Sequence, residues 1–251
     1  MSLKNKIDSQ NIPQHIAVIM DGNGRWAQKA GKERVFGHQS GVDAVRDTVE
    51  GCRELGVKFL TLYAFSTENW NRPIEEVNAL MELLVQSIVN ETDSLQKNDI
   101  SLNFIGDIDR LPENCKNTLS LVIDKTSNNK SMTLTLALSY SGRWDIVNAL
   151  KNIVGKISEG SITSDTINEK LIQSYLSTAN MPDPELMIRT SGEFRISNFL
   201  LWQIAYSEIH ITDTLWPEFR KEHLYAAILD YQNRERRFGK TGDQLKKELS
   251  R

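Results

Sequence analysis

The chain has 251 residues, a quarter of which are charged, and its formal net charge is −3. This charge gives no overall attraction to nucleic acid, so we expect no nucleic-acid partner. No apolar run approaches the roughly 18 residues of a membrane-spanning helix, and the polar start of the chain has no signal-peptide core. Its two cysteines lack metal-binding spacing, which is typical of a reducing compartment. We therefore expect a cytoplasmic protein that can still touch the inner face of a membrane.

Predicted strands and helices alternate along the chain. Apolar and β-branched runs predict strands at 15–20, 58–66, 101–107, 132–140, 185–190 and 208–212. Helical spacing predicts helices at 41–55, 74–97, 111–127, 146–157, 164–176 and 218–238, with one more apolar helix between the last two strands. This order predicts an α/β fold, with a mainly parallel six-stranded sheet flanked by helices. We assign residues 15–240 to a single domain, residues 1–14 to a flexible arm and residues 241–251 to a tail.

Polar motifs follow several of these strands. They lie at residues 21–25, 66–72, 141–145 and 189–197. Parallel sheets bind ligands beyond the carboxyl ends of their strands. We therefore expect the four segments to meet at one edge of the sheet.

The first of these motifs is Asp21-Gly22-Asn23-Gly24-Arg25-Trp26. Its glycines let the backbone approach a ligand closely, and a carboxylate beside arginine suits a phosphate ester bound with Mg²⁺. An ordinary turn would carry similar residues. Residues 22–27 also fit the loose dinucleotide fingerprint G-x-G-x-x-A, with Asp43 about 20 residues further on. Against that alternative, Asp21 would repel a pyrophosphate, and Arg25 is bulky where the helix must pack closely on the strand.

Arginines are concentrated near the same edge. Arginine binds phosphate oxygens in a bidentate way, and two diphosphate substrates explain so many better than one does. Any single member could instead be a surface arginine in an ordinary ion pair. The five are Arg25, Arg34, Arg72, Arg189 and Arg195.

Several long segments together resemble the cis-prenyltransferases, most closely the bacterial undecaprenyl diphosphate synthases. They are HIAVIMDGNGRWA, GHQSG, LYAFSTENWNRP, SGRWDIV, IRTSGEFRISNFLLWQIAYSEIHITDTLWP and NRERRFG, in unchanged order from about residue 13 to 240. The resemblance implies an Mg²⁺-dependent transferase that condenses farnesyl diphosphate with successive isopentenyl diphosphates. Each addition forms a Z double bond, and the long product serves as a lipid carrier in cell-wall synthesis. The resemblance also implies a homodimer.

The resemblance further implies roles for individual residues. Asp21 and Asn69 match catalytic residues, and Asp21 and Glu208 match the metal ligands. A neutral amide is a poor base, so a phosphate oxygen of the substrate rivals Asn69 as the proton acceptor. Arg237 and Gly239 match a motif that reaches the site of the neighbouring subunit. The full substrate-binding set is Gly22, Asn23, Gly24, Arg25, Trp26, Arg34, His38, Ser66, Thr67, Glu68, Trp70, Arg72, Arg189, Arg195, Ile196, Ser197, Arg237 and Gly239.

The long helix at 74–97 carries an unbroken apolar stripe. Periodicity alone cannot separate an ordinary core-facing stripe from the wall of a cavity. The resemblance implies a tunnel that holds the growing chain, lined by Ala64, Leu84, Ile88, Ile100 and Met132. Ala64 is small and leaves room in this tunnel, so we expect Ala64→Leu to shorten the product.

The chain departs from the family pattern at three small polar residues. Ser139 and Ser141 stand in a segment that often reads AANYGGR, and Ser191 stands where RTGGE is common. These departures affect the fine geometry of the site and leave the expected reaction class unchanged. Two other classes remain open: a dinucleotide-binding oxidoreductase, which nicotinamide binding would reveal, and a non-catalytic partner subunit. The presence of Asp21 and Asn69 argues against the second.

Overall fold

The structure is a computed structural model that describes residues 2–237, 239, 241 and 244. Its six strands form one sheet in the order β3-β4-β2-β1-β5-β6, and every neighbouring pair is parallel. The predicted six-stranded α/β fold is therefore confirmed. The strands are β1 (His15–Ile19), β2 (Phe59–Ser66), β3 (Ile100–Ile105), β4 (Met132–Tyr140), β5 (Leu186–Arg189) and β6 (Glu208–Ile211).

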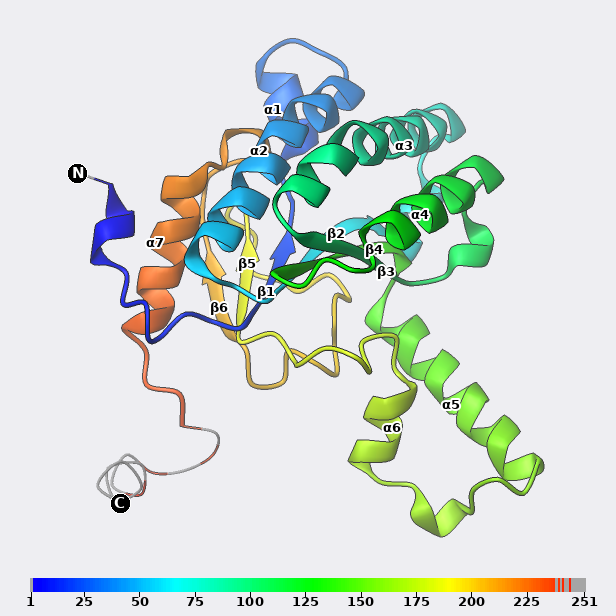
Figure 1. The fold of residues 1–251 in the computed structure, drawn as a ribbon. Helices are drawn as coiled ribbons and strands as arrows, with labels where there is room; N and C mark the ends of the chain where they lie inside the picture. Colours follow the sequence, from blue (N-terminus) through cyan, green and yellow to red (C-terminus); the bar gives the residue numbers. More distant parts are fainter. Residues whose placement is uncertain (1, 238, 240, 242–243, 245–251) are drawn as a thin grey trace.

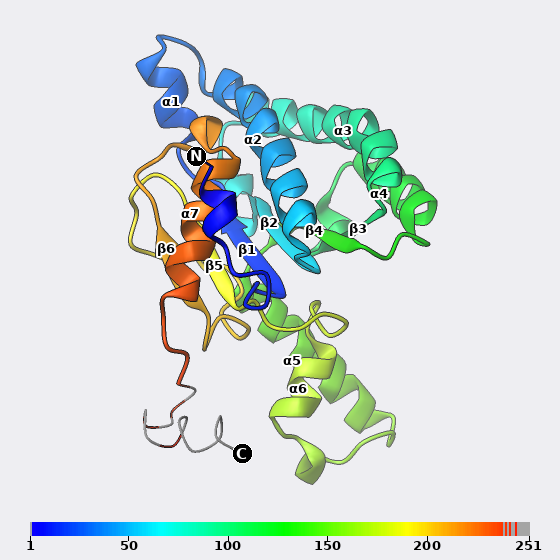
Figure 2. The ribbon, with the colours of Figure 1, turned by 60° about the vertical axis from the view of Figure 1, so that its left-hand side comes forward.

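Four helices cover one face of the sheet, and two project from the domain. Helices α2, α3, α4 and α7 lie over the same face, whereas α5 and α6 extend away from the sheet (Figure 1 and Figure 2). The short helix α1 packs against α2. The helices are α1 (Asn23–Lys29), α2 (Arg34–Leu55), α3 (Ile74–Lys97), α4 (Glu113–Thr126), α5 (Gly142–Ser158), α6 (Glu169–Tyr175) and α7 (Lys221–Gln232).

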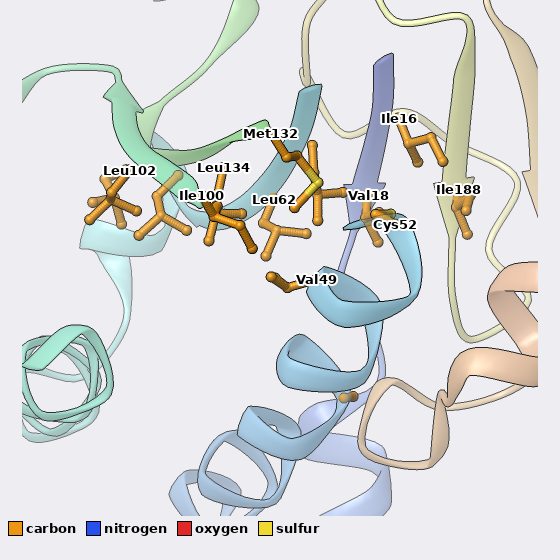
Figure 3. Packing of buried hydrophobic residues seen from close by; sticks show 14 of the residues in the cluster. Ile16, Val18, Val49, Cys52, Leu62, Ile100, Leu102, Met132, Leu134 and Ile188 are labelled. Atoms are coloured by element: carbon orange, nitrogen blue, oxygen red, sulfur yellow. The ribbon is translucent and has the colours of Figure 1, made fainter. Parts of the chain in front are cut away.

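The main hydrophobic core lies between the sheet and these covering helices. Val49 and Cys52 on α2 face a layer of strand side chains that includes Val18, Leu62 and Leu134 (Figure 3). A second cluster lies on the opposite face, where irregular segments supply Met181, Phe199 and other residues. Both faces are buried, which explains why the central strands are almost continuously apolar in sequence.

The apolar helix predicted between the last two strands is wrong. Residues 199–206 form a bend followed by turns, although Phe199 and Ile204 are buried as a helix face would be. Ser197, Asn198 and Leu200 have positive φ values of 48°, 60° and 45°. Left-handed residues interrupt a right-handed helix, so tertiary contacts override the local helical pattern here.

The N-terminal arm, predicted to be flexible, is packed against the domain from residue 2 onward. Lys4 forms a 2.6 Å ion pair with Glu54 of α2. Gln232 of α7 donates to the carbonyl oxygen of Asn11 at 2.8 Å, and Ile12 packs against the main core. Charge and apolar contacts thus fix an arm that looks polar in sequence. The predicted tail at 241–251 lies almost wholly outside the described residues.

No helix among the described residues has both the length and the apolar character needed to cross a bilayer.

Candidate active site

The predicted edge is assembled where β1 and β5 end. Asp21 lies two residues after the end of β1, and Gly22 is the N-cap residue of α1, with a φ of 106°. A Cβ on Gly22 would lie 3.0 Å from both the Leu215 side chain and the Ser191 Cβ. Glycine is therefore required at position 22 for two reasons: the positive φ of the backbone and the close approach of the neighbouring loops.

A buried ion pair joins these two strand ends. Arg189 is 3 % exposed and donates from Nη2 to Oδ2 of Asp21 at 2.7 Å. Its Nη1 donates to Ser197 Oγ at 2.7 Å and to the carbonyl oxygen of Arg195. Burial by itself would raise the pKa of Asp21, but Arg189 and then Arg25 hold this pKa below its usual value. Asp21 is therefore ionised at neutral pH.

Residues missed by the sequence analysis hold the backbone of Asp21. The Thr190 hydroxyl accepts from the Asp21 amide at 2.9 Å and donates to the Asp21 carbonyl at 2.6 Å. The Trp216 amide donates to the same carbonyl at 3.0 Å. The strand-end position of Thr190, one residue after Arg189, was the only signal in the sequence for its role.

A polar cavity of about 210 Å³ opens beside Asp21. Glu76, also missed, faces two of its arginines, with Oε1 3.0 Å from Arg72 and 3.5 Å from Arg34. Burial and then the charge of Arg72 lower the pKa of His38 to about 4. His38 is therefore neutral at pH 7 in the free protein. The cavity is lined by Met20, Asp21, Gly22, Asn23, Gly24, Arg25, Arg34, His38 and Arg72.

The segment at 66–72 forms a short 3-10 helix, η2 (Thr67–Asn71), next to this cavity. Ser66 and Asn69 form a capping box at its start. Glu68 accepts a 2.8 Å hydrogen bond from Asn198, which ties η2 to the segment after β5. Trp70 donates from Nε1 to the buried Ser139 Oγ at 2.9 Å. These contacts hold the segment over the strand ends.

The pairing of β2 with β4 is irregular close to η2. Tyr63 pairs with Ala137 and Phe65 with Leu138, so the register shifts at Ala64. A second shift leaves Ser139 unpaired, with a φ of 48°. Such irregularities redirect side chains near functional sites. Here they turn Ala64 toward a cavity and Ser139 toward Trp70.

A larger, mainly apolar cavity of about 390 Å³ runs between α2, α3 and the sheet. It shares Met20, Asp21, Asn23, His38 and Arg72 with the polar cavity, so the two cavities adjoin each other. The predicted tunnel residues Ala64, Leu84 and Ile88 line it. Ile100 and Met132 do not; they pair with each other at the start of β3 and β4 and are buried in the core. Leu102 and Leu134, two residues further along these strands, take their place.

Other predicted substrate-binding residues lie near the edge without lining either cavity. Trp26 stacks on Phe36 and donates to Glu218 at 3.1 Å. Arg195 is largely exposed and paired with Glu193. Ile196 packs against the second core cluster. Thr67 donates to the adjacent Glu68 carboxylate at 3.2 Å.

Three residues lie away from this edge within the chain. Glu208 pairs with Leu186 at the start of β6, three positions before the level of Arg189, which is about 10 Å along the strand. It accepts from Arg234 at 3.0 Å. Arg237 and Gly239 are exposed and line neither cavity, and Phe238 between them lies outside the described residues. Their predicted roles stay predictions.

No group of three or more His, Cys, Asp or Glu side chains in the described part of the chain is placed to hold a metal ion. Asp21 supplies the one carboxylate among the described residues that line the polar cavity. Mg²⁺ is commonly held by one or two carboxylates together with substrate phosphate oxygens. The ionised, partly exposed Asp21 carboxylate in a phosphate-sized polar cavity fits that kind of site.

Comparison with known proteins gives matches over nearly the whole chain. A family model described as "Putative undecaprenyl diphosphate synthase" matches residues 19–239. An isoprenyl transferase of Chlorobaculum tepidum is 54 % identical over 94 % of this chain and 89 % of its own length. A ditrans,polycis-undecaprenyl-diphosphate synthase specific for (2E,6E)-farnesyl diphosphate, from Pasteurella multocida, is 51 % identical over 93 % of this chain and 98 % of its own.

The fold also matches a solved enzyme structure. The crystal structure of lavandulyl diphosphate synthase from Lavandula x intermedia, in complex with dimethylallyl diphosphate, superposes with a TM-score of 0.89 at 36 % identity. The match covers 92 % of this chain and all of that one. The sequence matches and the fold match agree in extent, and neither supports the dinucleotide-binding alternative.

Proposed function

The chain belongs to the undecaprenyl diphosphate synthase family of cis-prenyltransferases, and we propose that it extends farnesyl diphosphate with isopentenyl diphosphate units to undecaprenyl diphosphate. The substrates and product follow from the names of relatives about half identical to this chain. A lipid diphosphate needs a polar site for its head and an apolar site for its tail. The adjoining of the two cavities, which share Asp21, Asn23, His38 and Arg72 in their walls, is the observation that carries the proposal.

In this proposal the polar cavity holds the allylic diphosphate. Arg25, Arg34 and Arg72 lie where their guanidinium groups can donate to its oxygens. The allylic carbon–oxygen bond breaks as the diphosphate leaves, and negative charge grows on that group. Fixed positive groups stabilise such charge without reorganising at the moment of reaction. The backbone N–H groups of the first turn of α1, that of Gly24 among them, add hydrogen-bond donors at the same cavity.

Arg189 and Ser197 support a second diphosphate site on the other side of Asp21. Arg189 is held by Asp21, and its neighbour Ser197 lines the apolar cavity. An isopentenyl diphosphate bound there would place its double bond toward the allylic carbon. Closure of η2 would keep water from the electron-deficient allylic group. The proton lost from isopentenyl diphosphate goes to Asn69 or to a phosphate oxygen.

Mg²⁺ is part of the proposal. Asp21 would hold the ion together with substrate phosphate oxygens. When bound, Mg²⁺ would neutralise charge on the diphosphate leaving group. Glu208 faces Arg234 within this chain, so any role in metal binding requires a rearrangement or a second subunit.

We also propose a homodimer. Val147, Leu150 and Val154 form an apolar stripe along α5 and are each about half exposed. Phe194, in the segment after β5, is 87 % exposed. Large exposed apolar stripes mark protein interfaces. Sedimentation of Leu150→Glu tests this, with the similarly exposed Leu121→Glu on α4 as the matched control: the first should become monomeric and the second should stay dimeric.

The proposed reaction is tested by incubating the protein with Mg²⁺, farnesyl diphosphate and labelled isopentenyl diphosphate, then extracting lipid-soluble label. The wild type should incorporate label and should stop when a chelator is added. Asp21→Ala should incorporate almost none. A folded wild type that transfers no label would contradict the proposal and favour a non-catalytic partner subunit.

A further inference from the structure

Ser191 occupies a backbone position that disfavours a side chain. It lies in the turn after β5 with a φ of 74° and is 6 % exposed. Its amide donates to the carbonyl oxygen of Thr214 at 2.9 Å, and the next residue, Gly192, donates to that of Thr212 at 2.9 Å. Residues other than glycine in this conformation are strained and persist when their surroundings hold them there. The side chain of Ser191 should therefore do something that glycine could not.

The Ser191 side chain contacts the guanidinium of Arg25. Arg25 Nη1 donates to the Ser191 carbonyl oxygen at 3.0 Å, and Nη2 donates to the Ser191 hydroxyl. Two adjacent nitrogens are thus held by two oxygens of one residue. This fork fixes both the position and the plane of the guanidinium, because arginine has rigid planar donors.

The other neighbours of Arg25 are two carboxylates. Nη2 lies 3.1 Å from Glu193 Oε1 and 3.5 Å from Asp21 Oδ1. Nη2 is already within ion-pair distance of Glu193. Without the hydroxyl it would turn fully toward these two negative groups, and a diphosphate would have to displace them. The hydroxyl is a neutral acceptor, so it orients Nη2 without cancelling the charge that a phosphate oxygen needs. Arg25 remains 43 % exposed at the wall of the polar cavity.

We propose that Ser191 is a positioning residue that orients Arg25 for the allylic diphosphate. The strain of its left-handed backbone is the structural cost of that hydroxyl. This inference rests on the proposed function in naming the ligand as an allylic diphosphate. The contact itself predicts weaker binding of any diphosphate when the hydroxyl is lost.

Two variants separate the hydroxyl from the backbone. Ser191→Gly removes the hydroxyl and the strain, so its Tm should rise by about 2–4 °C. Ser191→Ala removes the hydroxyl and keeps the strain, so its Tm should not rise. Both should raise KM for farnesyl diphosphate about three- to tenfold, the effect of losing one hydrogen bond. A purely structural role would move Tm and leave KM unchanged.

A double-mutant cycle tests whether the effect passes through Arg25. In an Arg25→Lys background, Ser191→Ala should raise KM little further, because the fork no longer exists. Fully independent effects on KM, or an increase in KM with glycine but not with alanine, would overturn the proposal.

Binding of inorganic diphosphate provides a readout that does not depend on turnover. Its stabilisation of Tm should be smaller in both Ser191 variants than in the wild type. If the wild type binds diphosphate in this Ser191-dependent way but elongates nothing, the proposed function fails and this inference stands. If the wild type elongates and both variants keep its KM and its diphosphate response, this inference fails and the proposed function stands.

Discussion

Arg189 donates to Asp21 at 2.7 Å across 168 residues of sequence and thereby links the ends of β1 and β5. The pair fixes a carboxylate and a guanidinium at the junction of a polar and an apolar cavity. The main chain of Asp21 is held in place by the Thr190 hydroxyl and the Trp216 amide, which both donate to its carbonyl oxygen.

Asp21→Asn should reduce kcat/KM by about 10²–10³, because an uncharged amide cannot supply the negative charge that the site uses. The free energy of unfolding should fall by about 1–3 kcal/mol, since Arg189 would lose its ionised partner. Steady-state kinetics and urea unfolding measure the two effects. Asp93→Asn, an exposed surface carboxylate paired with Lys125, is the control and should leave both unchanged. Wild-type kinetics in Asp21→Asn would remove Asp21 from the mechanism.

Gly37→Ala tests the packing of α2 against α1. A Cβ there would lie 2.0 Å from the carbonyl oxygen of Asn23, so the helices must separate. We expect a loss of about 1–3 kcal/mol in the free energy of unfolding, together with weaker substrate binding. Gly155→Ala on α5 meets no atom within 4 Å and should stabilise the protein by about 0.5–1 kcal/mol. Equal effects of the two substitutions on stability would show that close packing at Gly37 is unimportant.

The hydrogen bond from Trp70 to Ser139 should keep η2 closed. Trp70→Phe leaves the buried Ser139 hydroxyl without this donor, and Ser139→Ala removes the acceptor. Each should speed amide hydrogen exchange in residues 66–72, and the double variant should exchange about as fast as either single variant. Additive effects would mean that the two side chains act independently. Exchange in β1 serves as the internal control.

Ala64→Leu should shorten the product. Ala64 lines the apolar cavity at the register shift between β2 and β4, so a larger side chain takes space from the growing tail. The first additions should proceed at near the wild-type rate, and the ladder of products should end earlier. Met132→Leu, buried outside the cavity wall, is a volume-conserving control and should leave product length unchanged. An unchanged product distribution in Ala64→Leu would contradict the assigned cavity.

Stability should fall in mild acid because of His15. This side chain is 1 % exposed, with its ring nitrogens 2.6 Å from the Pro182 carbonyl oxygen and 2.8 Å from the Thr61 hydroxyl. Burial lowers its pKa to about 4, from 6.5 in the unfolded chain. As pH falls between these values the unfolded chain binds the proton first, so the free energy of unfolding drops by up to about 3 kcal/mol. Above pH 6.5 the effect is absent.

His15→Gln does not titrate and should flatten the dependence of stability on pH between 6.5 and 4. Some slope should remain, because His38 also has its pKa lowered to about 4. Chemical unfolding at several pH values measures this slope. An identical slope in the variant and the wild type would show that His15 is not its source.

Sequence patterns predicted the sheet well because its central strands are buried on both faces and its strands are bounded by turns. The bounds of α3 and β4 are as predicted, Ile74–Lys97 and Met132–Tyr140. The same patterns failed for residues 199–206, where apolar residues are buried by turns whose left-handed conformations depend on distant contacts. Local periodicity contains no information about those contacts.

The rule that parallel sheets bind ligands beyond the carboxyl ends of their strands predicted that Asp21, Arg72 and Arg189 lie close together. All three line the apolar cavity. The same rule could not find Thr190 or Glu76, whose roles depend on which backbone and side-chain groups they face in space. Nor could it place Glu208, which lies on a strand of the same sheet but at the opposite end. Whether a motif residue on a strand lies at the site can be predicted only when it is known which end of the strand the residue occupies.

The most direct test of the central claim is the size of the product. Purified protein is incubated with Mg²⁺, farnesyl diphosphate and excess isopentenyl diphosphate, and the dephosphorylated products are sized by chromatography. We predict a ladder that ends near the undecaprenyl length, with Z geometry at each added unit. Products that stop after one addition, or that form only from dimethylallyl diphosphate, would show that the two adjoining cavities serve a different condensation.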